Sequence, residues 1–178
     1  MAKSKTVTGK MITSFDKFKA SWEKNAGEPE QTIFHYLIAL LNIERDIKIA
    51  DAMMSILVHK DRTLEDLMSP SGRKLGRTQR YYLMHTKENP DVPKSYLGGT
   101  PENDYKINKS RLPMTVLKIE KLKRKRGPAT VKLWIQSAGK DSPTPTQLSK
   151  NKYGQWKITE CSSIITGVRP SQEELEDF

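Results

Sequence analysis

The sequence has little of what several classes of protein require. It contains one cysteine, Cys161, which excludes an internal disulfide and a zinc site built from several cysteines. It has no run of about 18 apolar residues, so we expect no membrane-spanning helix and no membrane partner. The sparing use of cysteine fits a reducing compartment, and we therefore expect a cytoplasmic protein.

The sequence also has fewer acidic than basic residues. The 178 residues include 31 Lys and Arg but 21 Asp and Glu, so the formal net charge is +10 at pH 7. Hydrophobic residues make up 35% of the chain, which is lean, yet the net charge per residue is too small for a disordered chain. The length suits one domain. We therefore expect a basic, globular, single-domain protein.

Residues 13–68 have the hydrophobic spacing of amphipathic helices. Phe15, Phe18 and Trp22 form one stripe on a first helix that ends near Gly27. The segment after it is the most apolar of the chain, so we expect that helix to be the most enclosed by the fold. The predicted helices cover residues 15–25, 30–45 and 47–59, with one further turn over residues 63–68 that begins with a capping box.

Residues 78–170 change to a hydrophobic period of two, which is typical of strands. The first such segment is rich in aromatic side chains. Further along the chain, Val131, Leu133 and Ile135 share one face of a predicted strand and form the apolar surface that receives the helices. The predicted strands cover residues 79–86, 114–123, 129–138, 147–150 and 155–161.

Residues 88–111 collect proline, glycine, asparagine and acidic residues and predict a long loop. About 20 residues without regular structure are unusual in a compact domain, which leaves three alternatives open. The loop is functional, or it contains a strand that the period does not reveal, or it is held in place by its own side chains. The side chains available for that last role are Tyr96, Leu97 and Tyr105.

Helices followed by strands predict an α+β fold, with N-terminal helices packed on a curved antiparallel β-meander. A single domain is expected over residues 13–170, divided into a helical half and a sheet half. A flexible N-terminus, residues 1–12, precedes it. An acidic tail, residues 171–178, follows it and either extends freely or folds over a basic patch.

Catalytic motifs are missing from the sequence. His35, His59 and His85 match no metal-binding spacing, and neither of the two glycine-rich phosphate loops occurs. We expect no metal, no cofactor and no catalytic residue, so the first hypothesis is a small cytosolic binding or interaction module. An enzyme is the alternative, with a pocket under the 88–111 loop. Its candidate pocket residues are Tyr81, His85 and Tyr105.

Positive charge is concentrated in two segments of the sequence. Residues 71–80 carry four cations and no acid, and residues 118–126 carry six cations and one acid. Such segments suit a polyanion, nucleic acid or phosphate, because phosphate contacts release counterions and nearby aromatic rings stack on bases. The alternative is a solvated loop and a charged hairpin tip. The candidate polyanion-binding residues are Arg73, Lys74, Arg77, Arg80, Lys123, Arg124, Lys125 and Arg126.

The sheet face opposite the expected core is mixed in character and carries Lys132, Trp134 and Gln136. Tryptophan is amphipathic and enriched at interfaces. This face is therefore the candidate contact with a protein partner, centred on Trp134.

Three segments carry a resemblance to known sequences. They are residues 76–86 (GRTQRYYLMHT), residues 98–105 (GGTPENDY) and residues 154–170, which include GQWKI, Ser162-Ser163 and GVRP. Together they resemble an uncharacterised bacterial family known as a domain of unknown function, over about residues 15–170. The resemblance implies no activity, cofactor or catalytic residue, and it implies that the long loop belongs to the domain. The final hairpin is also similar to those of cystatin-like rolls, which implies a curved sheet.

Overall fold

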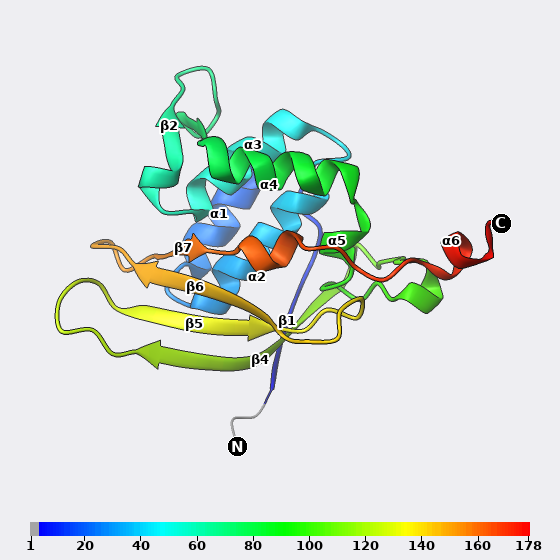
Figure 1. The fold of residues 1–178 in the computed structure, drawn as a ribbon. Coiled ribbons are helices and arrows are strands. Elements are labelled where there is room, and N and C mark those ends of the chain that lie inside the picture. The colour runs from blue at the N-terminus through cyan, green and yellow to red at the C-terminus, as the bar shows by residue number, and fades with distance from the viewer. Residues whose placement is uncertain (1–3) are drawn as a thin grey trace.

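Helices cover one face of an antiparallel sheet in the computed structural model, which describes residues 4–178 (Figure 1). The sheet has the strand order β1-β4-β5-β6-β7, and a separate two-stranded sheet pairs β2 with β3. This arrangement confirms the predicted α+β class, and β4 to β7 form the predicted antiparallel meander. The strands are β1 (Lys5–Gly9), β2 (Thr63–Glu65), β3 (Arg73–Leu75), β4 (Leu112–Leu122), β5 (Thr130–Ile135), β6 (Thr144–Lys150) and β7 (Trp156–Glu160).

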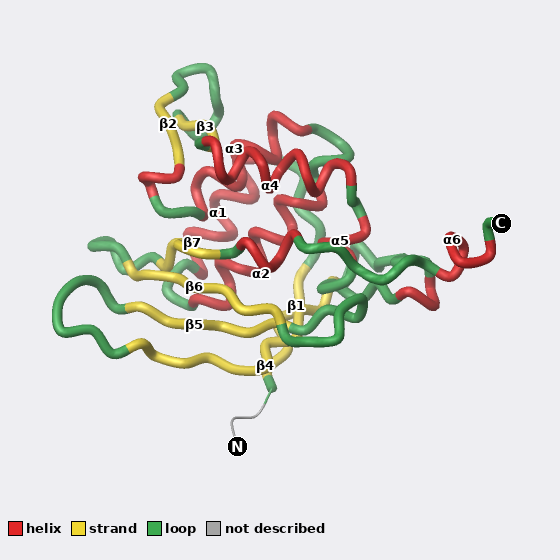
Figure 2. The backbone as a smooth tube through the Cα atoms, viewed as in Figure 1, coloured by secondary structure: helices red, strands yellow, loops and turns green. Residues whose placement is uncertain are grey.

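Most of the helices form the second layer of the molecule, whereas the short C-terminal helix lies apart from that layer (Figure 2). The three helices predicted over residues 15–59 are present as α1, α2 and α3, which confirms these three predictions. Within the described residues none of the helices is long and apolar enough to cross a membrane. The helices are α1 (Phe15–Asn25), α2 (Pro29–Leu41), α3 (Ile47–Leu57), α4 (Arg77–Glu88), α5 (Asp91–Lys94) and α6 (Gln172–Glu176), with 3₁₀ turns η1 (Lys60–Arg62), η2 (Pro101–Asn103) and η3 (Ser162–Ile165).

The starts of the first three helices follow from their sequences. Ser14 caps α1, and its hydroxyl accepts a hydrogen bond from the backbone N–H of Lys17 at 3.4 Å. Pro29 occupies the first turn of α2, where a missing N–H costs little. The Asp46 carboxylate accepts from the backbone N–H groups of Lys48 and Ile49 at the start of α3.

The core lies between α2 and the inner face of the sheet. Every residue of α2 from position 32 to position 41 is buried, as the apolar character of this segment predicts. Val131, Leu133 and Ile135 of β5 are buried on the inner face, whereas Trp134 is part-exposed on the outer face. Each buried side chain of Leu or Phe size stabilises the fold by about 1.5–3 kcal/mol, so this contact fixes the packing of helices on sheet.

Residues 79–86 are helical, so the strand predicted for them is wrong. They belong to α4, whose buried face consists of Gln79, Leu83 and Thr86. These positions are four and three residues apart, which is the spacing of one helix face. The buried phenol of Tyr36 donates to Gln79 Oε1 at 2.9 Å and ties this face to α2. The run of aromatic residues looked like a strand because Tyr81 and Tyr82 interrupt the helical pattern.

The helical turn predicted over residues 63–68 is also wrong. Residues 63–65 form β2 and pair with β3, with Thr63 opposite Leu75. The Thr63 hydroxyl donates to the carbonyl oxygen of Lys60 at 2.7 Å and accepts from the Arg73 guanidinium at 2.6 Å. The capping residue is therefore engaged in the small sheet and does not start a helix.

Residues 5–9 correct the prediction of a flexible N-terminus over residues 1–12. They form β1, which pairs with β4 from Lys5 opposite Val116 to Gly9 opposite Leu112. Val7 on this strand is buried in the core. Its partner lies more than 100 residues away along the chain, so no local pattern reveals the pairing. Residues 1–3 lie outside the described part of the chain.

The long segment over residues 88–111 is held in place by its own side chains. Tyr96, Leu97 and Tyr105 are buried, and the Tyr96 hydroxyl donates to the carbonyl oxygen of Ile164 at 3.0 Å. The segment contains α5 and η2, and no strand lies between positions 88 and 111. Of the three alternatives, the structure supports the one in which buried aromatic residues order the loop.

The acidic C-terminal segment contains the short helix α6. Ser171 and Glu174 form a capping box at its start. The backbone N–H of Glu173 donates to Asp104 Oδ1 at 2.9 Å, next to η2. The tail thus contacts an acidic residue of the long loop rather than a basic patch.

Candidate anion-binding groove

A groove of about 560 Å³ opens between four parts of the fold. Its walls come from α1, the end of α3 with η1, the small β2–β3 sheet, and the turn between β6 and β7. We call it the cationic groove because, among the described residues, six basic side chains and one carboxylate, that of Glu23, line it. The six basic residues are Lys19, Lys60, Arg73, Lys150, Lys152 and Lys157.

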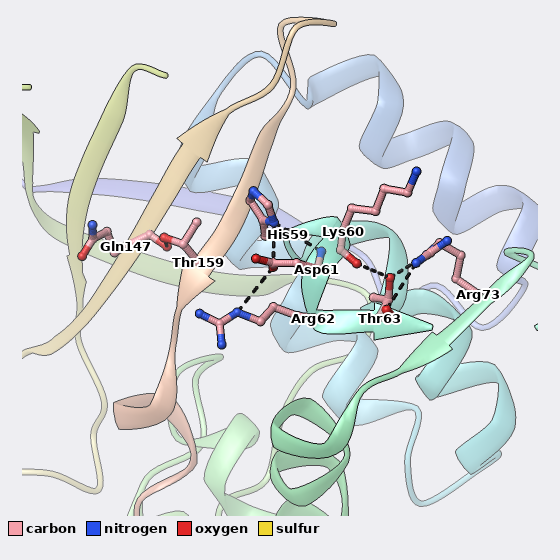
Figure 3. A network of polar contacts seen from close by, with 8 residues as sticks. All are labelled: His59, Lys60, Asp61, Arg62, Thr63, Arg73, Gln147 and Thr159. Carbon is pink, nitrogen blue, oxygen red and sulfur yellow. Dashed lines mark hydrogen bonds and ion pairs between the residues drawn. The ribbon is translucent and has the colours of Figure 1, made fainter. Parts of the chain in front are cut away.

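The small β-sheet fixes one basic side chain of the groove. Arg73 lies on β3, opposite Glu65 of β2. Its guanidinium donates from Nε to Thr63 Oγ1 at 2.6 Å and from one terminal nitrogen to the Thr63 carbonyl oxygen at 3.2 Å (Figure 3). Both acceptors are neutral, so these hydrogen bonds orient the guanidinium without cancelling its charge.

The turn between β6 and β7 presents two more lysines, Lys150 and Lys152. The Asn151 side chain accepts hydrogen bonds from the backbone N–H groups of Tyr153 and Gln155, both at 3.0 Å. Gly154 has a φ of 77°, a left-handed conformation that glycine adopts without strain. These features form the turn of a hairpin that joins β6 to β7, in the place of the predicted strands 147–150 and 155–161. The turn geometry sets the positions of both lysines at the rim of the groove.

Lys157 lies deeper in the groove than the other lysines. Its side chain extends from β7 to the C-terminal end of α3, where Nζ donates to the carbonyl oxygen of Ile56. The same nitrogen lies 4.4 Å from the centroid of the Trp22 ring. Burial of the side chain lowers the pKa of Lys157 to about 8, against a smaller opposing effect of Glu23.

A second, smaller hollow of about 370 Å³ adjoins the cationic groove. The two hollows share His59, Pro128 and Ser149 as lining residues. The second hollow adds Arg62 and Arg124, and its carboxylates are Asp61 and Glu160. The two hollows together therefore expose eight cationic side chains against three carboxylates.

The three carboxylates have partners within the protein. Glu23 lies 3.7 Å from Lys19. Asp61 lies 2.7 Å from the imidazole of His59 and 3.6 Å from Arg62 (Figure 3), and Glu160 accepts from the backbone N–H of Ser162. Across residues 4–178, no carboxylate lies within 4.0 Å of five of the groove's cations or of Arg124. The surface therefore carries uncompensated positive charge.

The two predicted basic segments meet here in part. Arg73 lines the cationic groove, and Arg124 lines the adjoining hollow. Arg80 lies 4.0 Å from Asp51 instead. The remaining predicted residues belong to neither lining, being placed on β3, at the start of α4, or in the exposed turn between β4 and β5. These are Lys74, Arg77, Lys123, Lys125 and Arg126.

The candidate enzyme pocket is not gathered in one place. Tyr81 and His85 lie on the solvent side of α4, with their rings stacked at a centroid distance of 5.9 Å. Tyr105 is buried, its hydroxyl donates to the Arg169 carbonyl oxygen at 2.6 Å, and it borders a separate hollow that contains neither of the other two. The hypothesis of a shared pocket for these three residues stays without structural support.

The sequence does not reveal one pair of side chains, Ser21 and His35, that has the geometry of a nucleophile and its base. The Ser21 hydroxyl lies 2.9 Å from His35 Nε2, and His35 Nδ1 lies 2.7 Å from the Gln31 carbonyl oxygen. Burial lowers the pKa of His35. Neither Ser21 nor His35 lines the cationic groove, and the ring packs edge-on against Phe18, so the pair ties α1 to α2.

The remaining reactive side chains give no catalytic arrangement. Burial raises the pKa of the Cys161 thiol to about 11, which is the opposite of an activated nucleophile. The Gln79 amide lies 3.6 Å from its sulfur, inside the core. In the part of the chain that the structure describes, no group of three His, Cys, Asp or Glu residues could hold a metal ion.

The outer sheet face surrounds Trp134 with cations. Lys118 Nζ lies 5.0 Å and Lys132 Nζ lies 4.9 Å from the centroid of its indole ring. The neighbouring Ile119 of β4 is 40% exposed. A protein contact through this face stays a prediction.

Sequence reasoning missed all five lysines that line the groove. Lys150 and Lys152 flank the start of a predicted turn, a signal available in the sequence, but they stand within no basic run. Lys19, Lys60 and Lys157 lie on three different elements and meet through the tertiary fold. A search for clustered charge along the chain therefore finds Arg73 and Arg124 but not their partners.

The comparisons with known proteins give a family but no activity. The family model described as "Domain of unknown function (DUF6935)" matches residues 10–172. No curated protein and no solved structure matches the chain, so the likeness of the final hairpin to cystatin-like rolls stays a prediction. The match confirms the resemblance to an uncharacterised family drawn from the sequence. The chain therefore belongs to the DUF6935 family, a domain of unknown function.

Proposed function

We propose that the protein is a binding module for a polyanion, with single-stranded nucleic acid as the ligand class. The observation that carries the proposal is the convergence of uncompensated cations from several elements on two adjoining hollows. Each phosphate bound there releases condensed counterions, which supplies most of the affinity of such sites. A cytoplasmic location, favoured by the single cysteine, belongs to this proposal.

The extent of the surface favours a chain of phosphates over a single ion. Basic side chains line both hollows, with Lys152 and Arg73 in the cationic groove and Arg124 in the adjoining hollow. Tyr153 at the rim is 73% exposed, and Lys152 Nζ lies 5.1 Å from its ring centroid. An exposed aromatic ring beside phosphate-binding lysines is the arrangement on which unpaired bases stack.

The test measures binding of a fluorescently labelled oligothymidylate by anisotropy between about 50 and about 200 mM salt. The variant is K150Q/K152Q, which removes two rim cations but keeps the turn. The matched control is K106Q/K109Q, two exposed lysines near η2 that lie outside both hollows. We expect the logarithmic salt slope of K150Q/K152Q to be shallower by about 1.4, because each lost contact on a single strand removes about 0.7.

The control variant is expected to bind like the wild type. The proposal fails if the wild type binds the oligothymidylate no more tightly than a non-specific ligand, with a Kd above about 10⁻⁴ M. It also fails if both double variants lose affinity equally, because the cations would then act through net charge alone.

A further inference from the structure

We propose that Lys157 is an attachment site for small anionic aldehydes, which it binds covalently as an imine within the cationic groove. The inference concerns the same groove as the proposed polyanion site but does not depend on polyanion binding. It rests on the position of one amine among five other cations in a hollow of ligand size.

The position of Lys157 differs from that of every other lysine in the groove. Its nitrogen sits between the carbonyl oxygen of Ile56, to which it donates, and the face of the Trp22 ring. Lys150 and Lys152 are exposed and lie over the rings of Trp156 and Tyr153 at the rim. A neutral amine at this place keeps its hydrogen bond to the carbonyl and has a lone pair free for reaction.

The protonation state of Lys157 suits nucleophilic attack. Its pKa of about 8 leaves about a quarter of the amine neutral at pH 7.5, whereas an ordinary lysine is neutral to about one part in a thousand. Desolvation causes the shift, and the carboxylate of Glu23 on α1 opposes it. The other titratable groups that line the groove are cations, one imidazole and one phenol, namely Lys19, His59, Lys60, Arg73, Lys150, Lys152 and Tyr153.

The rest of the groove favours an anionic ligand of small size. A volume of about 560 Å³ falls in the range of small-molecule sites, roughly 300–1,000 Å³. The guanidinium of Arg73 and the ammonium groups at the rim attract a carboxylate, sulfonate or phosphate. The hydroxyl groups of Ser55 and Ser71, 2.8 Å apart, add neutral hydrogen-bonding partners on the same lining.

The reaction is a condensation that needs no oxidant or metal. The neutral amine of Lys157 attacks the aldehyde carbon, a C–N bond forms, and the carbonyl oxygen takes up a proton. The resulting carbinolamine loses this oxygen and both former amine hydrogens as one water molecule, which leaves the C=N bond of the imine. Hydrolysis reverses every step, so the attachment is reversible until a reductant traps it.

The test uses 4-formylbenzenesulfonate as the anionic probe and its neutral counterpart, 4-formylbenzenesulfonamide. The wild-type protein is incubated with each probe and cyanoborohydride at pH 7.5, and peptide mapping by mass spectrometry locates the reduced adducts. Lys48, an exposed lysine at the start of α3, is the internal reference. We expect the sulfonate to label Lys157 at least about tenfold faster than Lys48, in line with the difference in neutral amine.

Two variants separate attraction from reactivity. In K150Q/K152Q the labelling of Lys157 by the sulfonate is expected to slow several-fold, while labelling by the sulfonamide stays unchanged. In E23Q both probes are expected to label Lys157 faster, because the carboxylate that favours the ammonium form is gone. Labelling of Lys157 no faster than of Lys48 overturns the inference, and so does equal labelling by both probes relative to that reference.

Competition separates this inference from the proposed function. If oligothymidylate slows labelling of Lys157, both stand. If Lys157 is labelled preferentially but oligothymidylate has no effect, the aldehyde site stands and the polyanion proposal loses its support. If oligothymidylate binds in the groove but Lys157 is not labelled preferentially, the aldehyde site is wrong and the polyanion proposal stands.

Discussion

The indole nitrogen of Trp22 donates a hydrogen bond to the hydroxyl oxygen of Thr32 at 3.0 Å, and both side chains are buried. The Thr32 hydroxyl donates in turn to the carbonyl oxygen of Trp156 at 2.9 Å. This chain of two hydrogen bonds connects α1 to α2 and α2 to β7. It also fixes Trp22, the residue whose ring lies beside Lys157.

Thr32→Val is therefore expected to destabilise the protein by about 1–3 kcal/mol, because it leaves a buried N–H and a buried carbonyl oxygen unsatisfied. The measurement is the free energy of unfolding from urea titration. Thr86→Val is the matched control, since the Thr86 hydroxyl donates to the Tyr82 carbonyl oxygen within its own helix. A loss for Thr32→Val no larger than for Thr86→Val would show that the connection between α1, α2 and β7 contributes nothing.

A helix and a strand over residues 79–86 predict different effects of substituting Tyr81 and Leu83 on stability. In a strand, Tyr81 and Leu83 would share one face. In α4, Leu83 is 1% exposed and Tyr81 is 62% exposed. We expect Leu83→Ala to cost about 2–5 kcal/mol of unfolding free energy and Tyr81→Ala less than about 1 kcal/mol. Thermal and urea unfolding of both variants check this, and equal losses would contradict the helix.

The buried amine of Lys157 makes stability depend on pH. Its folded pKa of about 8 lies below the ordinary lysine value of 10.5, so between these values the unfolded chain binds more protons than the folded protein. The free energy of unfolding therefore rises with pH across this window. Below about pH 8 the amine is protonated in both states, so this gain in stability is absent and the full cost of burying the ammonium group remains. We expect wild type to gain stability relative to Lys157→Met between pH 7.5 and pH 9.5.

Urea titrations of both proteins at several pH values give this difference directly. Because other titrating groups are common to both proteins, their effects cancel in the comparison. A difference between wild type and variant that is constant from pH 7.5 to pH 9.5 would mean that Lys157 keeps an ordinary pKa. Such a result would also remove one of the two supports of the aldehyde site.

The turn between β4 and β5 offers a graded test of the polyanion surface. Arg124 lines the adjoining hollow, whereas its neighbours Lys123 and Lys125 do not. We expect Arg124→Gln to weaken oligothymidylate binding several-fold more than Lys123→Gln or Lys125→Gln, because one phosphate contact is lost. Equal effects of the three substitutions, measured by anisotropy at one salt concentration, would indicate a diffuse charge effect.

Local patterns were enough for the first three helices. The stripe of Phe15, Phe18 and Trp22 and the cap at Ser14 lie within a few residues of one another, so α1 could be read directly from the sequence. The same is true of the alternating residues of β5. Patterns failed for α4 and β2, because in both cases the side chains fit either structure locally and a distant partner decided between them. Gln79 accepts a hydrogen bond from Tyr36, and Thr63 accepts one from Arg73.

The amino-acid sequence alone determined the charge of this protein, its single cysteine, its family and the class of its fold, since these depend on composition and on short-range periodicity. The tertiary structure decided which cations meet. Lys19 and Lys157 are far apart in the chain, yet both line one groove because α1 and β7 both contact α3. Charge along a chain is a local property, whereas an electrostatic site depends on distances that the packed core sets.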